Sequence, residues 1–289
     1  MICAIIVSYN SDKVFRCFES IKAQADFIII VDNATKDKNI ILKLKQLANQ
    51  NNKYKIVFND ENFGIGHALN QGFEIAKKLN AFWVITLDCD SQMPKDTILN
   101  VMKSYQKLPA DIKNKTGLIA LNFIDINLVQ NFVKTKNENG FKQVKYALTS
   151  GNIIKMSAFE KTGCFNENLF IDQVDNDFDF RLRRKGFLIL ESCDNFILHE
   201  LGQSQKKFGI VIKNYSPIRR YYLSRNCIYI LKTYFCFDPY LCLKLFLRGV
   251  GGGFIKVLFL ENDKYEKISK IMEGIFDGLR GRFGKKYNP

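Results

Sequence analysis

Apolar runs rich in β-branched residues alternate with helical patterns through the first 120 residues of this chain. The runs cover residues 3–8, 27–31, 54–58, 83–88 and 117–122. Each of the first four ends in polar side chains, and the stretches between them are long enough for right-handed crossover helices. This alternation predicts an α/β fold built on a mostly parallel, doubly wound sheet.

The fourth run, Trp83 to Leu87, ends in two carboxylates one residue apart, Asp88 and Asp90. A buried strand would deliver both acids to the carboxyl edge of the sheet, where open α/β folds bind ligands. Carboxylate oxygens favour Mg²⁺ or Mn²⁺, which keep substrate phosphates in their coordination shell. The pattern therefore indicates a metal and phosphate site, with ordinary loop acids as the alternative.

A glycine-rich turn, Asn62 to Gly72, follows the third run and opens a helix. Gly64 and Gly66 would let the backbone approach a ligand, and a helix amino terminus suits phosphate. The turn differs from the dinucleotide-binding fingerprint and does not follow the first strand. It is a candidate phosphate cradle or simply a helix start.

A second group of acids lies at residues 172–179, within the stretch Leu169 to Arg181. In a helix, Val174 and Phe178 would form part of an apolar stripe, and Asp175 would lie beside it. Neighbouring carboxylates tend to raise the pKa of such an acid, which suits a general base. The alternative is a solvated helix start, where acids complement the helix dipole.

Three other stretches are less distinct. A helix is expected near residues 154–161, a helix start at Pro94, and a polar excursion or loop over residues 125–146. A short apolar run over residues 196–198 ends at His199, which is either a ligand or a structural histidine.

The carboxyl-terminal part is expected to be helical, with Arg225 near the start of a helical face. Residues 228–260 are rich in Phe and Leu but are interrupted by charges and glycines, and no run reaches the ~18 apolar residues of a spanning helix. A basic amphipathic surface lying on a membrane is one interpretation, and a buried helical face is the other. We predict two parts, residues 1–215 as a catalytic domain and residues 216–289 as a helical extension.

The formal net charge of +14, from 43 Lys and Arg against 29 Asp and Glu, favours an anionic partner. The basic residues are dispersed and no nucleic-acid module accompanies them, so a nucleic-acid partner is not expected. The 8 cysteines show no paired spacing, which argues against a zinc site or a disulfide framework. The amino terminus has no basic leader, and we expect a cytoplasmic protein.

Taken in order along the chain, these features resemble the inverting glycosyltransferases of family 2, which have the GT-A fold, and within them the rhamnosyltransferase-like branch of O-antigen and capsule synthesis. The resemblance is carried by Val7-Ser8-Tyr9-Asn10, Val31-Asp32-Asn33, Asn62 to Gly72, Leu87 to Ser91, Ser150-Gly151, Gly163-Cys164-Phe165, Phe170 to Asp175, Arg181, Gly186, His199 and Arg225-Asn226. Cys89 stands between the two acids, where the branch commonly has Gln followed by Asp-Ser, and Val174 replaces the acid that precedes Asp175 in the wider family.

The resemblance implies a role for each matching residue. Asp175 would be the catalytic base, and a divalent cation, Mg²⁺ or Mn²⁺, would be held by Asp88, Asp90 and His199. The nucleotide-sugar would be bound by Tyr9, Asn10, Asp32, Asn33, Gly64, Gly66, Asn70, Asp88, Ser150, Gly151 and Arg225.

The implied reaction is transfer of a sugar to a lipid-linked saccharide acceptor in surface polysaccharide synthesis. Rhamnose from dTDP-rhamnose is the first expectation, and a hexose from a UDP-sugar the second. The protein would lie peripherally on the anionic inner face of the cell membrane. A haloacid dehalogenase-type phosphatase would carry its Asp-x-Asp on the first strand, and an oxidoreductase would have its glycine fingerprint there. A non-catalytic sugar-nucleotide-binding or scaffold protein of the same fold remains the alternative.

Overall fold

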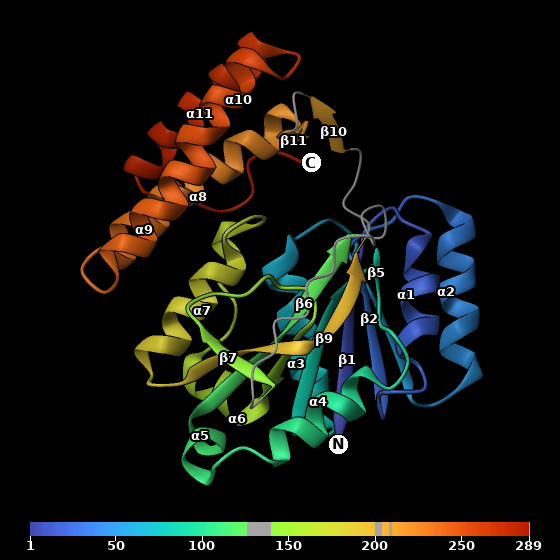
Figure 1. Ribbon diagram of the computed structural model, residues 1–289. Coiled ribbons are helices and arrows are strands. Elements are labelled where there is room, and N and C mark those ends of the chain that lie inside the picture. Colours follow the sequence, from blue (N-terminus) through green and yellow to red (C-terminus); the bar gives the residue numbers. More distant parts are fainter. Residues whose placement is uncertain (126–139, 200–203, 208–209, 289) are drawn as a thin grey trace. The chain divides into compact units, whose positions relative to one another are not determined.

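The computed structural model describes residues 1–125, 140–199, 204–207 and 210–288, which form two compact units (Figure 1). The first unit comprises Met1–Phe165 and Phe178–Glu200, and the second comprises Asn166–Asp177 and Leu201–Pro289. The expected division at residues 215 and 216 stays a prediction.

The amino-terminal half of the first unit is a parallel sheet. β1 (Ile2–Ser8) lies between β2 (Phe27–Asp32) and β4 (Trp83–Asp88), and β3 (Tyr54–Phe58) pairs with the far side of β2. The full strand order is β3-β2-β1-β4-β8-β6-β9-β5, with β7 paired to β9. The predicted α/β class with a mostly parallel sheet is therefore confirmed.

The other half of the sheet is mixed. β8 (Asn152–Lys155) runs antiparallel between β4 and β6 (Thr116–Asp125), while β6 runs parallel to β9 (Leu188–His199). β5 (Ser91–Gln92) and β7 (Phe141–Val144) pair antiparallel with β9. Residues 126–139 of the expected excursion lie outside the described residues, and β7 falls within its remainder.

Helices pack on both faces of this sheet. α1 (Lys13–Ile21) and α2 (Lys38–Gln50), which lie side by side in Figure 1, share a core cluster with α4 (Thr97–Gln106) and with alternate residues of β1 and β2. On the opposite face, α3 (Ile65–Lys78) approaches β1 so closely that a Cβ at Gly72 would lie 2.7 Å from the Ile5 side chain. α5 (Ala110–Lys115) and α6 (Met156–Thr162) complete this part.

Two expected helix starts are wrong. The helix expected from residue 154 begins at Met156, because Ile153 and Ile154 are buried in strand β8. A short apolar run does not distinguish a strand from a buried helical turn. The helix expected at Pro94 begins at Thr97, whose N–H and hydroxyl both donate to the Pro94 carbonyl.

The second unit is mainly helical. Its elements are η2 (Glu167–Leu169), the hairpin strands β10 (Ser204–Lys207) and β11 (Ile210–Lys213), α8 (Pro217–Tyr234), α9 (Pro239–Phe246), the π turn η3 (Leu247–Gly251), α10 (Gly252–Phe259) and α11 (Lys264–Leu279). α7 (Val174–Arg184) begins in this unit and continues in the first. None of the helices in the described part of the chain is long and apolar enough to cross a membrane.

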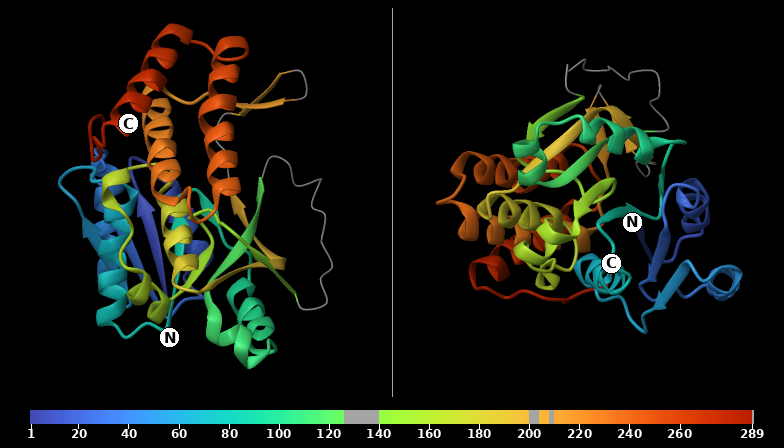
Figure 2. Two further views of the ribbon diagram at one scale, coloured as in Figure 1. Left: turned by 90° about the vertical axis from the view of Figure 1, so that its left-hand side faces the viewer. Right: turned by 90° about the horizontal axis from the view of Figure 1, so that it is seen from below.

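α8 and α11 lie side by side in the second unit (Figure 2). A Cβ at Gly274 would lie 2.3 Å from the Tyr221 carbonyl oxygen, and one at Gly278 would lie 2.8 Å from that of Arg225. Glycine therefore permits this close helix contact. Nearby, Glu261 is buried between the cations of Arg220 and Lys267, and the Lys267 ammonium also donates to Asn214 at 2.5 Å.

Candidate functional site

The parallel strands of the first unit end together at one edge. In the register, Ser8 pairs with Asp32 on one side, and Val7 pairs with Asp88 on the other. Tyr9 follows directly after β1. The structure thus brings Tyr9, Asp32 and Asp88 to the carboxyl edge of the sheet, where the sequence places the site.

The end of β4 is fixed by the loop that precedes β8. The N–H of Asp88 donates to Oγ of Ser150 at 3.0 Å, and this oxygen lies 2.7 Å from Oγ of Ser91. The N–H of Gly151 donates to the carbonyl of Thr86 at 2.8 Å. Gly151 has φ of +84°, and a Cβ there would lie 2.9 Å from Ile197, so this position requires glycine.

Asp90 is placed beside β9 through its neighbour in the chain. Ser91 pairs with His199 in the antiparallel ladder between β5 and β9. The backbone register therefore puts His199 opposite the residue that follows Asp90; the His199 side chain lies outside the described residues. Among the side chains that the structure describes, three potential His, Cys, Asp or Glu ligands do not gather in one place.

Cys89 separates the two acids and remains a neutral thiol. Burial, together with the charges of Asp90 and Asp88, raises its pKa to about 11. Both carboxylates are half-buried. The site at the end of β4 consequently combines two partly accessible anionic oxygen donors with a protonated sulfur.

Asp32 shapes the loop between β2 and α2. It is buried, and its two carboxylate oxygens accept from the N–H of Thr35 at 3.0 Å and from the Thr35 hydroxyl at 2.5 Å. The same hydroxyl accepts a hydrogen bond from the backbone N–H of Asn10 at 2.8 Å, and Oδ1 of Asn10 accepts one from the backbone N–H of Lys36. Asn10 and Asp32 therefore hold this edge of the candidate site together. Thr35 was not predicted; Asp32 signals a turn, because Asp side chains accept from backbone N–H groups shortly after them, but this does not single out Thr35.

Asn33 connects the end of β2 to the glycine-rich turn. Its amide donates to Oδ1 of Asn62 at 2.8 Å and to the carbonyl of Gly64 at 3.3 Å, and its oxygen accepts from Asn59 and from the N–H of Phe63. Gly64, the N-cap of α3, has φ of +89°, which excludes other residues without strain. The turn is thus rigidly supported by three asparagines, of which the sequence identified only Asn33.

Gly66 and Asn70 follow in α3, and both are buried. The Asn70 amide donates to the carbonyl of Phe165 at 3.0 Å and accepts the N–H of Phe165 at 2.8 Å. This two-way bond to the backbone favours a structural role for Asn70. Its assignment to nucleotide binding stays a prediction.

Asp175 belongs to the second unit and occupies the first turn of α7. It is half-exposed, and its Oδ1 accepts the N–H of Asn176 at 2.8 Å. The neighbouring acids have structural partners. Asp172 forms a bidentate pair with Arg219 at 3.1 and 3.2 Å, and Asp177 accepts from the hydroxyls of Tyr229 and Tyr234 at 3.0 and 2.6 Å.

The backbone before Asp175 is strained. Phe170, Asp172 and Gln173 have φ of +63°, +61° and +65°. Phe170 forms the centre of a γ-turn, because the N–H of Ile171 donates to the carbonyl of Leu169 at 2.8 Å. Each such residue costs about 1–3 kcal/mol and persists only where its surroundings impose it. The sequence contains no glycine here that could have signalled the conformation.

Arg225 is buried in the second unit among carbonyl oxygens and rings. Its guanidinium donates to the carbonyls of Gly284 at 2.6 Å and of Asn168 and Leu169 at 3.1 Å, and lies 4.8 Å from the ring centre of Tyr222. Burial lowers its pKa. These contacts favour a structural role, and contact with the nucleotide is not part of our proposal below.

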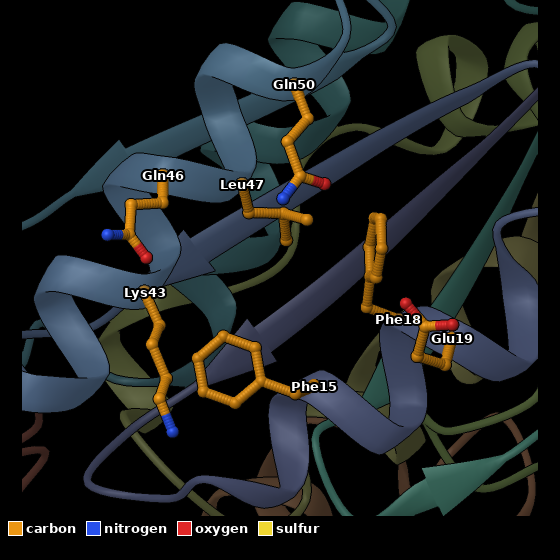
Figure 3. Close-up of a pocket in the computed structure, with 7 residues that line it drawn as sticks. All are labelled: Phe15, Phe18, Glu19, Lys43, Gln46, Leu47 and Gln50. Atoms are coloured by element: carbon orange, nitrogen blue, oxygen red, sulfur yellow. The ribbon is translucent and has the colours of Figure 1, made fainter.

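A shallow pocket lies apart from these residues, between α1 and α2 (Figure 3). It encloses about 240 Å³ and is lined by Phe15, Phe18, Glu19, Lys43, Gln46, Leu47 and Gln50. No residue of the candidate site lines it.

Both the sequence and the fold of this chain are similar to those of known proteins. Residues 3–114 match the family model described as glycosyl transferase family 2. Over 99% of its length the chain is 29% identical to a dTDP-rhamnosyl transferase, RfbF, of Shigella flexneri, covering 98% of that protein. It is also 25% identical to the low-salt glycan biosynthesis hexosyltransferase Agl10 of Haloferax volcanii, over 97% of this chain and 92% of that one.

The fold is shared with TarS of S. aureus, with a TM-score of 0.64 at 15% identity over 96% of this chain. The chain spans about half of that protein, 48% of its length. At such low identity this likeness shows the fold alone, which is the predicted GT-A fold. Residues 3–114 thus carry the match to family 2, and the chain as a whole is similar to two glycosyltransferases over nearly their full length, which supports a glycosyltransferase.

Proposed function

We propose that the protein transfers a sugar, with inversion, from a nucleotide donor to a lipid-linked saccharide in surface polysaccharide synthesis. Rhamnose from dTDP-rhamnose is the first candidate donor, supported by the similarity to the dTDP-rhamnosyl transferase, and a hexose from a UDP-sugar is the second. The observation that carries the proposal is the end of β4, where Asp88 is fixed by Ser150 and followed by the half-buried Asp90.

Asp175 is the proposed base. Its carboxylate would take the proton from the acceptor hydroxyl as that oxygen bonds to the anomeric carbon of the donor. The bond between this carbon and the phosphate oxygen breaks, and the nucleoside diphosphate leaves. One positioned carboxylate contributes about 10²- to 10⁴-fold in rate. Asp175→Asn should therefore bind donor normally and lose transfer.

Asp88 and Asp90 would hold Mg²⁺ or Mn²⁺, with His199 as a third ligand. Their two half-buried carboxylates provide the hard oxygen donors that these ions prefer, so the donor set fits. When bound, the cation supplies positive charge that stabilises the leaving diphosphate. Ser150 would keep the Asp88 backbone in place, and Asn10, Asp32 and Asn33 would shape the opposite wall of the donor site.

A membrane-facing surface is proposed for α9, η3 and α10. This helical run exposes Tyr240, Leu243, Leu247, Ile255, Leu258 and Phe259, with exposed fractions from 37% to 75%. Residues 239–260 contain Lys244, Arg248 and Lys256 but no acid. Self-association through this face would bring like charges together, whereas anionic lipid complements both the cations and the apolar side chains.

Vesicle sedimentation tests this surface. The protein should pellet with phosphatidylglycerol-containing vesicles, less so at high salt, and much less as Leu247→Gln/Phe259→Gln. Phe82→Gln, which changes another exposed aromatic residue of the first unit, is the matched control. Equal pelleting of all three proteins would refute the proposed surface.

The donor site is tested by calorimetric titration of dTDP and UDP into the wild type and Asp90→Ala, with Mn²⁺ or with EDTA. The expected result is metal-dependent binding of one nucleotide that is lost in Asp90→Ala. Which nucleotide binds then identifies the nucleobase of the donor. Binding without any transfer activity would favour the alternative, a non-catalytic nucleotide-sugar-binding protein of the same fold. Absence of binding under every condition would contradict both.

A further inference from the structure

The left-handed backbone before Asp175 is fastened to α8 by one asparagine. The side-chain nitrogen of Asn226 lies 2.8 Å from the carbonyl oxygens of Leu169 and Ile171 and 2.9 Å from that of Asp172. Asn226 is fully buried. An amide has two N–H donors, and both serve these three carbonyls.

Arg225 fixes the direction of that amide. Its Nε donates to Oδ1 of Asn226 at 3.0 Å, which turns the nitrogen of Asn226 towards the strained segment. One of its two terminal nitrogens donates to the backbone carbonyls of Asn168 and Leu169. The carbonyl of Leu169 therefore accepts hydrogen bonds from both Arg225 and Asn226. Two consecutive residues of α8 thus form a clasp, Arg225 and Asn226, around residues 168–172.

The clasp opposes a local preference for other conformations. Phe170 and Gln173 have side chains that disfavour positive φ, whereas Asp172 tolerates it better, so the segment would relax if its carbonyls were released. Gln173 is followed directly by Val174, the first residue of α7, and Asp175 is the second. The direction in which the helix starts, and with it the Asp175 carboxylate, depends on this segment.

We propose that Asn226, oriented by Arg225, is a positioning residue for Asp175. The inference rests on the proposed role of Asp175 as the base. It requires no contact between Asn226 and substrate. Loss of the clasp should lower turnover while leaving donor binding intact, because a displacement of about 1 Å at a reacting group can reduce the rate about 100-fold.

The test compares Asn226→Ala with the wild type and with Asp175→Asn in the same transfer assay. Asn226→Ala should lower kcat by about 10- to 100-fold and leave the dTDP or UDP dissociation constant within about twofold. Hydrogen exchange should speed up at the amides of residues 169–177 and remain unchanged in β1 and β4. Val257→Ala, a truncation in the core cluster that α10 shares with α8 and α11, is the control for general destabilisation of the second unit and should keep kcat.

Arg225→Lys provides a second variant if Asn226→Ala does not fold. It keeps the charge but cannot reach the carbonyls and the Asn226 oxygen together, so it should lower kcat in the same way. Normal kcat in either folded variant, with Asp175→Asn inactive, would overturn the positioning role alone. Full activity of Asp175→Asn would instead remove Asp175 as the base, and the positioning role with it. If Val257→Ala lost kcat to the same extent, the loss in Asn226→Ala would be explained by general destabilisation, and the positioning role would again be overturned.

Discussion

Ser91 and Ser150 bring their hydroxyl oxygens to 2.7 Å from each other, although 59 positions separate them in the chain. The Ser150 oxygen also accepts the N–H of Asp88. This small cluster connects β4, β5 and the loop before β8. The position of the two acids at the end of β4 therefore depends on hydroxyl groups that do not themselves carry charge.

Replacing Ser150 by Ala should weaken metal-dependent donor binding. The Asp88 N–H would lose its acceptor, a change of about 1–3 kcal/mol for a partly buried group, which corresponds to roughly 5- to 150-fold in affinity if it falls entirely on the bound state. Calorimetry with the nucleotide that binds wild type measures the effect. Ser150→Thr keeps the hydroxyl and is the control. Equal affinity in all three proteins would show that this hydroxyl does not support the site.

Replacing Thr35 by Val should destabilise the β2–α2 loop. Valine matches threonine in shape but removes the donor to Asp32 and the acceptor for Asn10. A loss of about 1–3 kcal/mol in the free energy of unfolding is expected, since the Asp32 carboxylate is buried. Denaturant unfolding measures this free energy, and Thr35→Ser should retain most of the wild-type stability. If the Thr35→Val and Thr35→Ser variants were equally stable, the hydrogen bonds of the hydroxyl would not contribute to stability.

Gly274→Ala should separate α8 from α11. The new Cβ would lie 2.3 Å from the backbone oxygen of Tyr221, which cannot move without displacing α8. Overpacking of this kind costs about 1–3 kcal/mol or more. Gly252→Ala is the control, because a Cβ there would lie an ordinary 3.6 Å from the Leu247 carbonyl oxygen in a helical backbone. The melting temperature should fall in Gly274→Ala and should stay the same or rise in Gly252→Ala.

Acid should release the carboxyl-terminal tail from α11. Burial alone would raise the pKa of Glu273, but hydrogen bonds from Lys270, Lys286 and Tyr287 lower it to about 2, against an ordinary value of 4.5. A carboxyl whose pKa is lower in the folded state contributes stability that is complete above the unfolded value and is lost as pH falls from about 4.5 towards 2.

Glu273→Gln should remove part of this acid dependence. The difference in unfolding free energy between wild type and variant should be largest near pH 6 and shrink steadily below pH ~4.5. Glu266→Gln, an exposed acid on the same helix, serves as the comparison. A difference that stayed constant with pH would contradict the lowered pKa of Glu273.

The parallel strands and their polar ends were predictable because each run combines β-branched residues with a turn signal. Asp88 follows from that pattern directly. Strand β8 could not be predicted in this way, because Ile153 and Ile154 fit a buried strand and a helical turn equally well. The positive φ of Phe170, Asp172 and Gln173 could not be anticipated either, since the carbonyls of this segment are bound by Asn226 from another part of the chain.

The residue types also concealed which polar groups are structural. Asn70 and Arg225 match positions of a family motif, yet their side chains bind the backbone of Phe165 and of residues 168–169. Such tertiary partners leave no periodic signal in a sequence. The roles assigned to Asp90 and Asp175 stay predictions that the experiments above decide, and the role of His199 also stays a prediction.

Chimeras between relatives are affected by the way residues 166–177 associate with the carboxyl-terminal helices. A donor fragment grafted at residue 216 would bring its own α8 but leave the recipient's Asp172, Leu169 and Asp177 behind. Asp172, Leu169 and Asp177 of this chain would then face foreign partners in place of Arg219, Asn226 and Tyr229. Recombination that exchanges the whole second unit would accordingly need two separate segments of the chain, inherited together, rather than one contiguous module.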